Sequence, residues 1–503
     1  MYRWLLLILL WCVAVVDNCA AQAYIPADKA TLNYRLVGFS GLKQPGIVKY
    51  QLEVAEGNYI SDNEFVQHIV VKKQAAEPRF IAELPAFGQS YTWRISAIGN
   101  NSVQAPLVHF MVLPLPLAFN DIQVIIPKNT NRYTDAYFFH DGAKALYNMK
   151  GEVVWFLPRV GAFDPTAEGI RDLKASPQGT ITFLGNGLPM EIDYNGKLLW
   201  AAPKTDSAEL TGEGNFHHEF QRRKNGHYYV MGNAFRIWNK CYPGVCDSTS
   251  ILPFGTNVAN TTNTRNLDFT TILEYDNNGS VVWKWNSMDY IIHSDLFQRL
   301  GKDGFADIDA HANAFTFSND GKIIYISFRN IDRVIALGYP SGKVLASYGT
   351  RYSLGKLPPK PMFSEQHSIQ ITGKSKLLMY NNNSNYETAQ PNVLECTLPV
   401  GKGELRKSWE APCLGTYPLL DDSTRKMGRH GGKVQELPDG SIMVANCSPY
   451  WSMYIIERNK KVTWEATFNK YNRAKARWEP LDSYRSEMIV DKVLIGRLIF
   501  GAN

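Results

Sequence analysis

Four histidines of this chain stand at matching distances from features of strand-like segments. His218 and His367 each lie three residues before a glutamine, and His311 and His430 each lie ten residues before a turn glycine. Arg329 ends the segment that follows His311. Imidazole can act as a nucleophile, a general acid or a general base, and the planar guanidinium of arginine binds tetrahedral oxyanions through paired hydrogen bonds. Together these residue types predict chemistry on an anion.

A metal centre is the other chemistry that clustered histidines allow, because imidazole is a common ligand of Zn, Mn and Cu. Arg329 would place a permanent positive charge beside such an ion, and only Glu219 and Glu365 add carboxylates in the same register. We therefore expect no metal and no other cofactor. On charge alone, esters of sulfate, phosphate and carboxylic acids are all candidate substrates.

The elements that must position these side chains form a repeat. A strand, a turn that usually contains glycine and a second strand that often closes on tryptophan recur six times, at residues 145–155, 190–200, 272–283, 334–348, 393–409 and 454–464. Upstream of most copies lies another hairpin, with turns at 177–179, 224–226, 319–321 and 438–440. Two hairpins per repeat give the four strands of a propeller blade. The chain is therefore predicted to be all-β, with a six-bladed β-propeller over residues 118–503; a pair of ordinary β-sandwiches is the alternative.

The propeller geometry converts these spacings into a site. The first strand of a blade lines the central channel and the second returns beside it, so the start of one and the end of the other share a face. His218, His311, His367 and His430 start first strands, and Arg329 and Asn381 end second strands. We expect these side chains, with His217 as a further candidate beside His218, to meet at one mouth of the channel.

The N-terminal part predicts export. Arg3 precedes an apolar stretch from Trp4 to Val16, and Ala21-Gln22-Ala23 is typical of a cleavage site, so residues 1–23 read as a signal peptide. A periplasmic or secreted protein is expected. No later stretch approaches the roughly 20 apolar residues of a membrane span.

Residues 24–117 carry no copy of the repeat. Their strand-like segments favour a small immunoglobulin or fibronectin-like β-sandwich, with Pro114 and Pro116 marking its boundary with the catalytic part. Its sheet edge could serve a partner chain, so a homodimer is possible. The net charge of +6 is spread over 503 residues without a basic run, which excludes an electrostatic case for nucleic acid.

Removal of a signal peptide would leave five cysteines. Cys241 and Cys246 are close enough in sequence to form a disulfide in an oxidising compartment, and Cys396 with Cys413 is a possible second pair. Cys447 is then expected to be a free thiol.

In these residues the chain resembles the bacterial arylsulfate sulfotransferases, exported six-bladed propeller enzymes that use no nucleotide donor. The most specific match is a histidine followed eighteen residues later by an arginine, here His311 and Arg329. Next comes a Gln-His pair followed by an Asn-rich strand end, here Gln366-His367 and residues 381–383. The resemblance covers residues 120–503, and the N-terminal sandwich is similar to the small domain that precedes the propeller in that family.

The resemblance implies transfer of a sulfuryl group from a phenolic sulfate donor to a phenolic acceptor. It makes His367 the nucleophile that carries the transient sulfate, and His311 and Arg329 the groups that bind the sulfuryl oxygens. His218 or His217 would supply the remaining site histidine, with His218 favoured because its register matches that of His367. His430 has no counterpart in the family and stays an additional candidate.

Two other functions fit the same residues. A propeller polysaccharide lyase would use a histidine or tyrosine base and would give an unsaturated product. A non-catalytic propeller that binds sulfated or aromatic ligands would keep its binding when His367 is lost.

Overall fold

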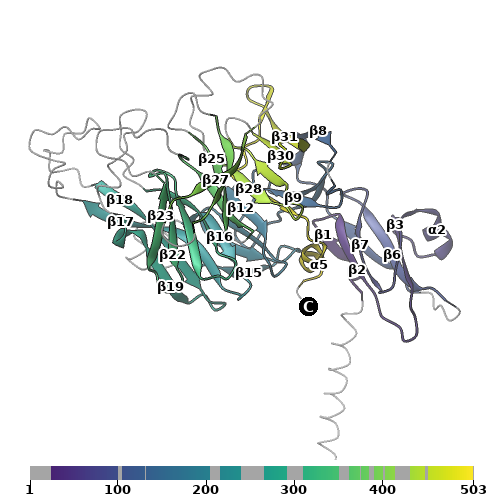
Figure 1. The fold of residues 1–503 in the computed structure, drawn as a ribbon. Helices are drawn as coiled ribbons and strands as arrows, with labels where there is room; N and C mark the ends of the chain where they lie inside the picture. The colour runs from purple at the N-terminus through teal and green to yellow at the C-terminus, as the bar shows by residue number, and fades with distance from the viewer. Residues whose placement is uncertain are drawn as a thin grey trace, which may run out of the picture.

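The computed structural model describes residues 24–99, 105–130, 132–203, 216–238, 265–291, 310–349, 362–373, 375–383, 390–399, 403–413, 431–447 and 451–501. Strands dominate this part of the chain, and α-helices are limited to α2 (Asp62–Gln67) and α5 (Lys492–Phe500) within it. The all-β prediction is confirmed (Figure 1). Residues 1–23, His430 and the pair Cys241 and Cys246 lie outside the described residues, so the signal peptide and that disulfide stay predictions.

The N-terminal residues form two small sheets. The larger has the strand order β1-β7-β6-β3-β4 and the smaller pairs β2 with β5. Ser61 caps α2, which lies between β3 and β4. The strands are β1 (Ala30–Leu32), β2 (Leu36–Ser40), β3 (Tyr50–Glu56), β4 (Ile69–Ala75), β5 (Arg79–Glu83), β6 (Ser90–Ala97) and β7 (Val108–Val112).

Six further sheets follow, which we number 1 to 6 in ring order. Sheet 1 is β33-β9-β10-β11, sheets 2 to 5 each take four consecutive strands from β12 to β27, and sheet 6 contains β28 to β32 with β8 added. Short 3-10 helices, η1 (Leu117–Asp121) and η2 (Ser287–Asp289), precede β8 and follow β19.

The strands of sheets 1 to 3 are β9 (Tyr137–His140), β10 (Ala145–Asn148), β11 (Val153–Phe156), β12 (Ile170–Ala175), β13 (Ile181–Gly185), β14 (Leu188–Ile192), β15 (Leu198–Ala201), β16 (Phe216–Arg222), β17 (Tyr228–Trp238), β18 (Arg265–Tyr275), β19 (Val281–Asn286) and β33 (Ser486–Ile489). Those of sheets 4 to 6 are β20 (Ala312–Phe317), β21 (Ile323–Phe328), β22 (Arg333–Gly338), β23 (Val344–Gly349), β24 (His367–Thr372), β25 (Lys376–Asn381), β26 (Asn392–Thr397), β27 (Arg406–Pro412), β28 (Lys433–Glu436), β29 (Ile442–Ala445), β30 (Ser452–Ile456), β31 (Val462–Asn472), β32 (Arg477–Pro480) and β8 (Ile122–Asn129).

The arrangement is propeller-like. The innermost strands contact one another in the order β33, β12, β16, β20, β24 and β28, and β28 contacts β33 again. The two ends of the chain interlock, because β33 pairs with β9 of sheet 1 while β8 pairs with β31 of sheet 6. Main-chain hydrogen bonds therefore join the N-terminal and C-terminal parts of the ring at two places.

The repeated motif has a local cause. In each of the six sheets the hairpin between the third and fourth strands contains a register shift near its turn. Gly151, Gly196, Gly279 and Gly342 take positive φ values of 69° to 86° in four of these turns. A glycine in this left-handed conformation followed by a bulge is a common hairpin connection. Lys460 occupies the same position in sheet 6 at φ 71°, which explains why the glycine signal is missing there.

The tryptophans that close the hairpins join neighbouring sheets. The indole of Trp155 in sheet 1 donates to the Tyr194 carbonyl at the turn of sheet 2, at 2.8 Å. Trp464 of sheet 6 donates to the Met149 carbonyl at the turn of sheet 1, at 3.0 Å. Trp283 and Trp409 make the equivalent bonds from sheet 3 to sheet 4 and from sheet 5 to sheet 6. A large apolar ring with one N–H thus fills the space between sheets and also fixes their order.

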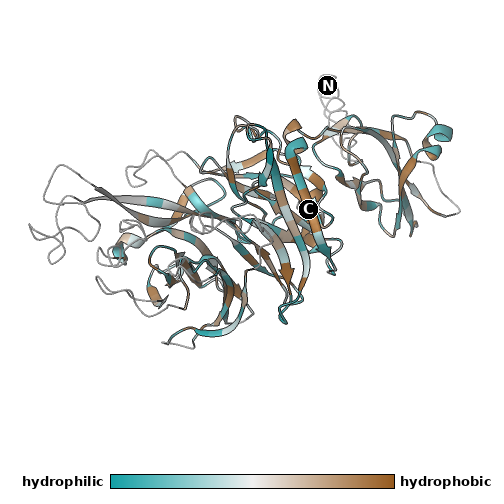
Figure 2. Ribbon diagram, turned by 90° about the horizontal axis from the view of Figure 1, so that it is seen from above, coloured by the Kyte–Doolittle hydropathy of each residue, from teal (hydrophilic) through white to brown (hydrophobic). Residues whose placement is uncertain are grey.

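Apolar residues follow the strands and hydrophilic residues gather at many turns (Figure 2). One hydrophobic cluster contains side chains from the N-terminal sheets, from sheets 1 and 2 and from α5. Arg35 strengthens this contact, donating to the carbonyls of Val153 and Leu84 at 2.7 and 2.8 Å. The N-terminal sheets therefore pack firmly on the ring.

The predicted Cys396–Cys413 disulfide is wrong. Both thiols are free and buried. In the β26–β27 pairing Cys396 lies opposite Lys407 and Asn392 lies opposite Pro412, so the cysteines stand at opposite ends of the hairpin. About five residues of strand correspond to roughly 17 Å, far beyond the reach of a disulfide. Cys447 forms no disulfide, as predicted, and its thiol donates to the Asp482 carboxylate at 3.2 Å. Among the described residues no helix has the length and apolar character needed to cross a membrane.

Candidate active site

The structure brings His217, His218, His311 and His367 together where the inner strands of sheets 3, 4 and 5 begin, while the predicted His430 lies outside the described residues. The Nε2 atoms of His218 and His311 are 3.2 Å apart, and the Nδ1 atoms of His217 and His218 are 2.5 Å apart. Each contact needs a proton on one ring and a lone pair on the other, so neutral imidazoles fit it. Burial and the nearby His217, His311 and His367 rings hold the pKa of His218 well below its ordinary value.

His367 is buried, with 3% of its surface exposed. Its Nδ1 lies 3.1 Å from the Glu365 carbonyl and 2.8 Å from the side-chain amide nitrogen of Asn382. The tautomer that donates Nδ1–H to the Glu365 carbonyl keeps a lone pair on Nε2. Burial and the positive charge of Arg329 lower the pKa of His367 well below its ordinary value, and the neutral ring is a competent nucleophile.

Arg329 follows the second strand of sheet 4. Its main-chain N–H donates to the His311 carbonyl at 2.9 Å, which confirms that the end of β21 returns to the start of β20. The guanidinium bonds Glu365 at 2.9 Å and Asn330 at 2.8 Å. This arrangement fixes a cation beside His367 in a partly buried position.

The backbone at these positions is strained. Four non-glycine residues at the mouth have left-handed φ values: His218 at 63°, His311 at 50°, Glu365 at 49° and Ser368 at 46°. The first hairpins of sheets 3, 4 and 5 also shift register there. Bulges re-aim side chains, and left-handed conformations of this kind collect at functional sites.

Asn381 and Asn382 differ in role. Asn381 accepts from the Ser364 main chain at 2.9 Å and donates to Asn392 and Asn383. Asn382 instead contacts His367 and donates to the Glu365 carbonyl at 2.8 Å. The Asn-rich run therefore marks the correct strand end. Because β25 ends at Asn381, the next residue, Asn382, is the one whose side chain faces His367.

Tyr484 is a site residue that the sequence pattern did not reveal. Its ring lies 5.5 Å from that of His218, between centroids, and the guanidinium groups of Arg171 and Arg485 each lie 5.3 Å from it. Its hydroxyl is shielded from solvent and has no hydrogen-bond partner among the described residues. Burial raises the pKa of Tyr484 although both arginines oppose the shift, so the phenol stays protonated.

A buried ion network lies directly behind this tyrosine. Arg485 bonds Asp172 at 3.1 Å and also contacts Glu219, while Lys174 bonds the same two carboxylates at 2.7 and 2.9 Å. Burial alone would raise the pKa of Glu219, but Arg485 and Lys174 more than offset it and hold that pKa well below its ordinary value. Two cations face two carboxylates, so the network is balanced and leaves the histidines without a net counter-charge.

The sequence repeat does not include Tyr484 and Arg485, for a topological reason. They precede β33, which is the inner strand of sheet 1 but is supplied by the C-terminus. Its hairpin partner β9 lies more than 300 residues earlier, so no local turn marks it. Within the described residues no group of three or more His, Cys, Asp or Glu side chains is arranged to hold a metal ion.

The solved structures that match this chain are only distantly similar to it. A protein of unknown function from Bacteroides caccae is 13% identical, with 66% of this chain and 93% of that chain covered at a TM-score of 0.40. A putative 6-phosphogluconolactonase from Bacteroides uniformis is 12% identical over 87% of this chain and 99% of that chain, and a periplasmic gluconolactonase from Pseudomonas aeruginosa is 9% identical over 88% and 99%, both at TM-scores of 0.30. With identities and TM-scores this low, these structures give no information about function.

No curated protein matches the chain. The family described as Arylsulfotransferase (ASST) does match, over residues 126–402, which is more than half of the chain and contains His218, His311, Arg329 and His367. The family name implies phenolic substrates. Transfer of a sulfuryl group is compatible with the neutral His367 beside the cation of Arg329. This chain therefore belongs to the arylsulfotransferase family, and its general activity is that of a sulfotransferase acting on aryl sulfates.

Proposed function

We propose that the protein transfers a sulfuryl group from a phenolic sulfate ester to a phenol in two steps, through a sulfohistidine on His367. The observation that supports this most directly is the environment of that ring. Its Nδ1 faces the Glu365 carbonyl, its Nε2 is left with a lone pair in the matching tautomer, and Arg329 provides a cation beside it. A metal or nucleotide is not part of the proposal.

In the first step the Nε2 lone pair of His367 forms a bond to sulfur while the bond from sulfur to the aryl oxygen breaks. The phenoxide leaves with the electron pair and takes a proton. The Nδ1–H bond to the Glu365 carbonyl stabilises the positive charge that develops on the ring. Arg329 stabilises the sulfuryl oxygens, and one such donor often contributes about 3 to 4 kcal/mol to the transition state.

The proton for the leaving phenoxide comes from the His218–His311 pair. In the free protein the lowered pKa of His218 keeps the His218 ring neutral. An aryl sulfate carries one negative charge into the site, and that charge favours uptake of a proton by the adjoining imidazoles. In the second step an acceptor phenol gives its proton back to the pair and attacks sulfur, and His367 leaves as a neutral ring.

We further propose a two-domain organisation of the chain. Sheets 1 to 6 are the blades of a six-bladed propeller over residues 118–503, and residues 24–117 are a separate β-sandwich domain of immunoglobulin or fibronectin type. The circular contacts of the inner strands and the interlocked chain ends support the first assignment. Export by a signal peptide over residues 1–23, a Cys241–Cys246 disulfide and a homodimer complete the proposal.

The decisive experiment uses the full mature chain with p-nitrophenyl sulfate, without nucleotide or added metal. p-Nitrophenol release should depend on a second phenol, and brief mixing without acceptor should add about 80 Da to the peptide that contains His367. Label on His218 or His430 would keep the reaction but overturn the assigned nucleophile. Absence of both release and label with several phenols would reject the proposal in favour of a lyase or a binding protein.

A further inference from the structure

A second site lies at the opposite ends of the strands that carry the catalytic residues. His218 lies near the start of β16, and Lys224 stands in the turn after this strand, six residues beyond His218. Six residues of extended chain span roughly 20 Å. The turn after β12, which contains Pro177 and Gln178, lies at the same end. A ligand bound there would leave the histidine mouth open.

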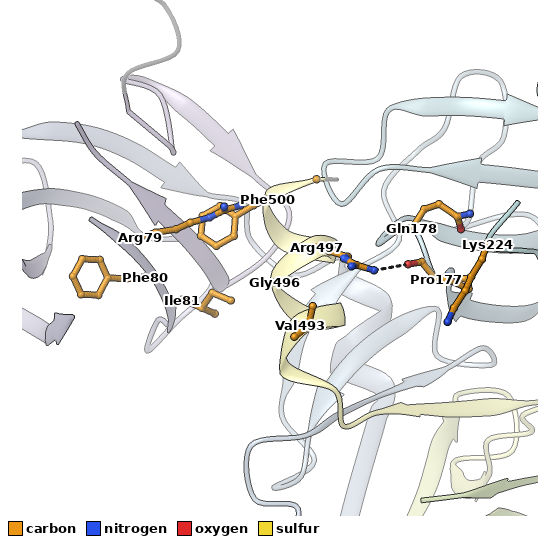
Figure 3. Close-up of a pocket in the computed structure, with 11 residues that line it drawn as sticks. Arg79, Phe80, Ile81, Pro177, Gln178, Lys224, Val493, Gly496, Arg497 and Phe500 are labelled. Carbon is orange, nitrogen blue, oxygen red and sulfur yellow. Dashed lines mark hydrogen bonds between the residues drawn. The ribbon is translucent and has the colours of Figure 1, made fainter. Parts of the chain in front are cut away.

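These turns form one wall of a large groove (Figure 3). Its cavity volume is about 990 Å³, and its other walls are β5 of the N-terminal sheets and α5. The groove is lined by Arg79, Phe80, Ile81, Pro177, Gln178, Lys224, Val493, Gly496, Arg497, Phe500 and Gly501. Three of these residues are cationic and none is acidic.

The walls are held rigidly by close packing. A side chain at Gly179 would meet Arg497 at 2.5 Å, so α5 lies directly on the turn after β12. A side chain at Gly38 would meet Ile499 at 2.6 Å, so the same helix lies directly on β2. Glycine permits both contacts, and its φ of 83° at Gly179 also suits no other residue well. The groove is therefore preformed.

Its three cations are spread along the groove. Arg79 lies flat on the Phe500 ring at 4.0 Å, Arg497 donates to the Pro177 carbonyl at 3.3 Å, and Lys224 extends from the far wall (Figure 3). No ion pair joins any of the three to a carboxylate among the described residues. A single small anion needs converging donors, whereas separated donors match repeated negative charges on one molecule.

A second cavity continues the charge pattern. It shares Ile81 with the groove, has a volume of about 700 Å³, and is lined by Lys73, Lys150 and Lys492 against Glu83 and Asp135. Glu83 is paired with Arg35 and Asp135 with Lys492, which leaves Lys73 and Lys150 as the positive charges outside these two pairs. The positive surface therefore extends on both sides of β5.

We propose that this groove binds an acidic polysaccharide chain. Guanidinium groups pair with sulfate or carboxylate groups on the polysaccharide, and exposed apolar side chains such as Val493 contact the sugar rings. The concave shape excludes a flat membrane surface. Because the groove is remote from His367, the ligand anchors the enzyme to a polymer and takes no part in sulfuryl transfer.

The test measures binding of a fluorescent heparin-derived octasaccharide and of an oligogalacturonate to the full mature chain by anisotropy. The triple variant R79Q/K224Q/R497Q should weaken binding about tenfold, since each exposed ion pair contributes modestly. The matched control K197Q/K343Q/K461Q removes three lysines from outer hairpin turns and should change binding less than about twofold.

Equal losses in the two triple variants would show charge-driven association without a site and would overturn the proposal. Tighter binding of a poly-glutamate peptide than of either saccharide, lost in the same variant, would assign the groove to an acidic protein instead. The single variant K224E guards against misfolding, because the Lys224 side chain forms no hydrogen bond or ion pair with the other described residues, and it should also weaken binding of the saccharides. Turnover of p-nitrophenyl sulfate should be unchanged in all these variants, so failure here and failure of the proposed reaction are separable.

Discussion

The two halves of the histidine mouth, formed by sheets 3 to 5 and by sheets 1 and 2, differ in how their charges are arranged. Sheets 3, 4 and 5 contribute imidazoles whose neutrality is enforced by burial, as the lowered pKa values of His218 and His367 show. Sheets 1 and 2 contribute the charged side chains of Arg485, Lys174 and Asp172, and the two cations are balanced by Asp172 and by Glu219 from β16 of sheet 3. The histidine half is therefore reactive because its imidazoles are neutral beside the Arg329–Glu365 ion pair, and the other half is structural because its charges are balanced.

An incoming sulfate is attracted mainly by one cation of the histidine mouth. Arg329 is the guanidinium whose charge acts most strongly on His367, and it belongs to the neutral half. The Tyr484 hydroxyl projects from the charged half without a partner among the described residues. Both groups should contact the substrate, while the ion network behind Tyr484 should only hold it in place.

Loss of the nucleophile tests the neutral half most severely. His367→Asn should lower kcat by at least about 10⁴-fold, because a removed nucleophile abolishes the covalent route. Single-turnover kinetics and peptide mass analysis should show neither a burst of phenol nor a labelled peptide. His227→Asn is the control, since His227 pairs with Glu274 at 2.7 Å away from the mouth and should keep full turnover.

Removal of the fixed cation comes next. Arg329→Gln should lower kcat/KM about 10²- to 10³-fold, since it removes a preorganised donor to the sulfuryl oxygens. Arg329→Lys keeps the charge but loses the fork that holds Glu365 and Asn330, and should recover only part of the loss. Equal activity of the lysine variant and the native protein would show that charge alone is required.

Tyr484→Phe tests the charged half with a smaller expected effect. Turnover should fall about tenfold to 10²-fold if the hydroxyl bonds the substrate. Thermal stability should stay the same or rise, because a buried hydroxyl without a partner is costly and its removal leaves no cavity. A fall in stability with unchanged turnover would assign Tyr484 a purely structural role.

Proton uptake on ligand binding tests whether the His218–His311 pair acts as the general acid. Binding of a non-transferable aryl sulfonate at pH 7 should take up protons, measured by calorimetry in buffers of different ionisation enthalpy, because the bound anion favours a charged His218–His311 pair. His218→Gln should lower this uptake and leave the affinity changed less than about tenfold. Identical heats in all buffers would remove the pair from the proton-transfer step.

The smallest effect concerns stability. Burial lowers the pKa of His140 to about 3, and its ring stacks on Phe468 with centroids 4.0 Å apart. An unfolded histidine titrates near about 6.5, so below that pH the unfolded chain binds a proton that the native chain refuses, and stability falls as pH falls toward about 3. His140→Phe should reduce the loss of unfolding free energy between pH 7 and pH 5 by about 1 to 2 kcal/mol, measured by urea titration.

Several features were readable from the residues because their causes are local. The hairpins follow from glycine turns, the register of His218 and His367 follows from strand periodicity, and the return of Arg329 to His311 follows from antiparallel pairing. The repeat is recognisable even in sheet 6, where Lys460 replaces the turn glycine, because Trp464 at the end of the motif is kept and bonds sheet 1.

Other features failed for equally physical reasons. The predicted Cys396–Cys413 disulfide rested on the short distance between the two residues in the sequence. In the β26–β27 hairpin, however, Cys396 pairs with Lys407 near the turn, whereas Cys413 follows the last residue of β27 at the open end. Asn382 rather than Asn381 faces His367 because the strand ends at Asn381 and the alternation of side chains stops there. Neither outcome is encoded in spacing alone.

The sequence by itself determined the strands, their turns and the family, because these depend on neighbouring residues and on short motifs. Only the tertiary structure decided which residues join the mouth from the far end of the chain. Tyr484 and Arg485 reach it because β33 pairs with β9. The balance of Arg485 and Lys174 against Asp172 and Glu219 likewise exists only after the ring has closed, since burial gives those charges their effect.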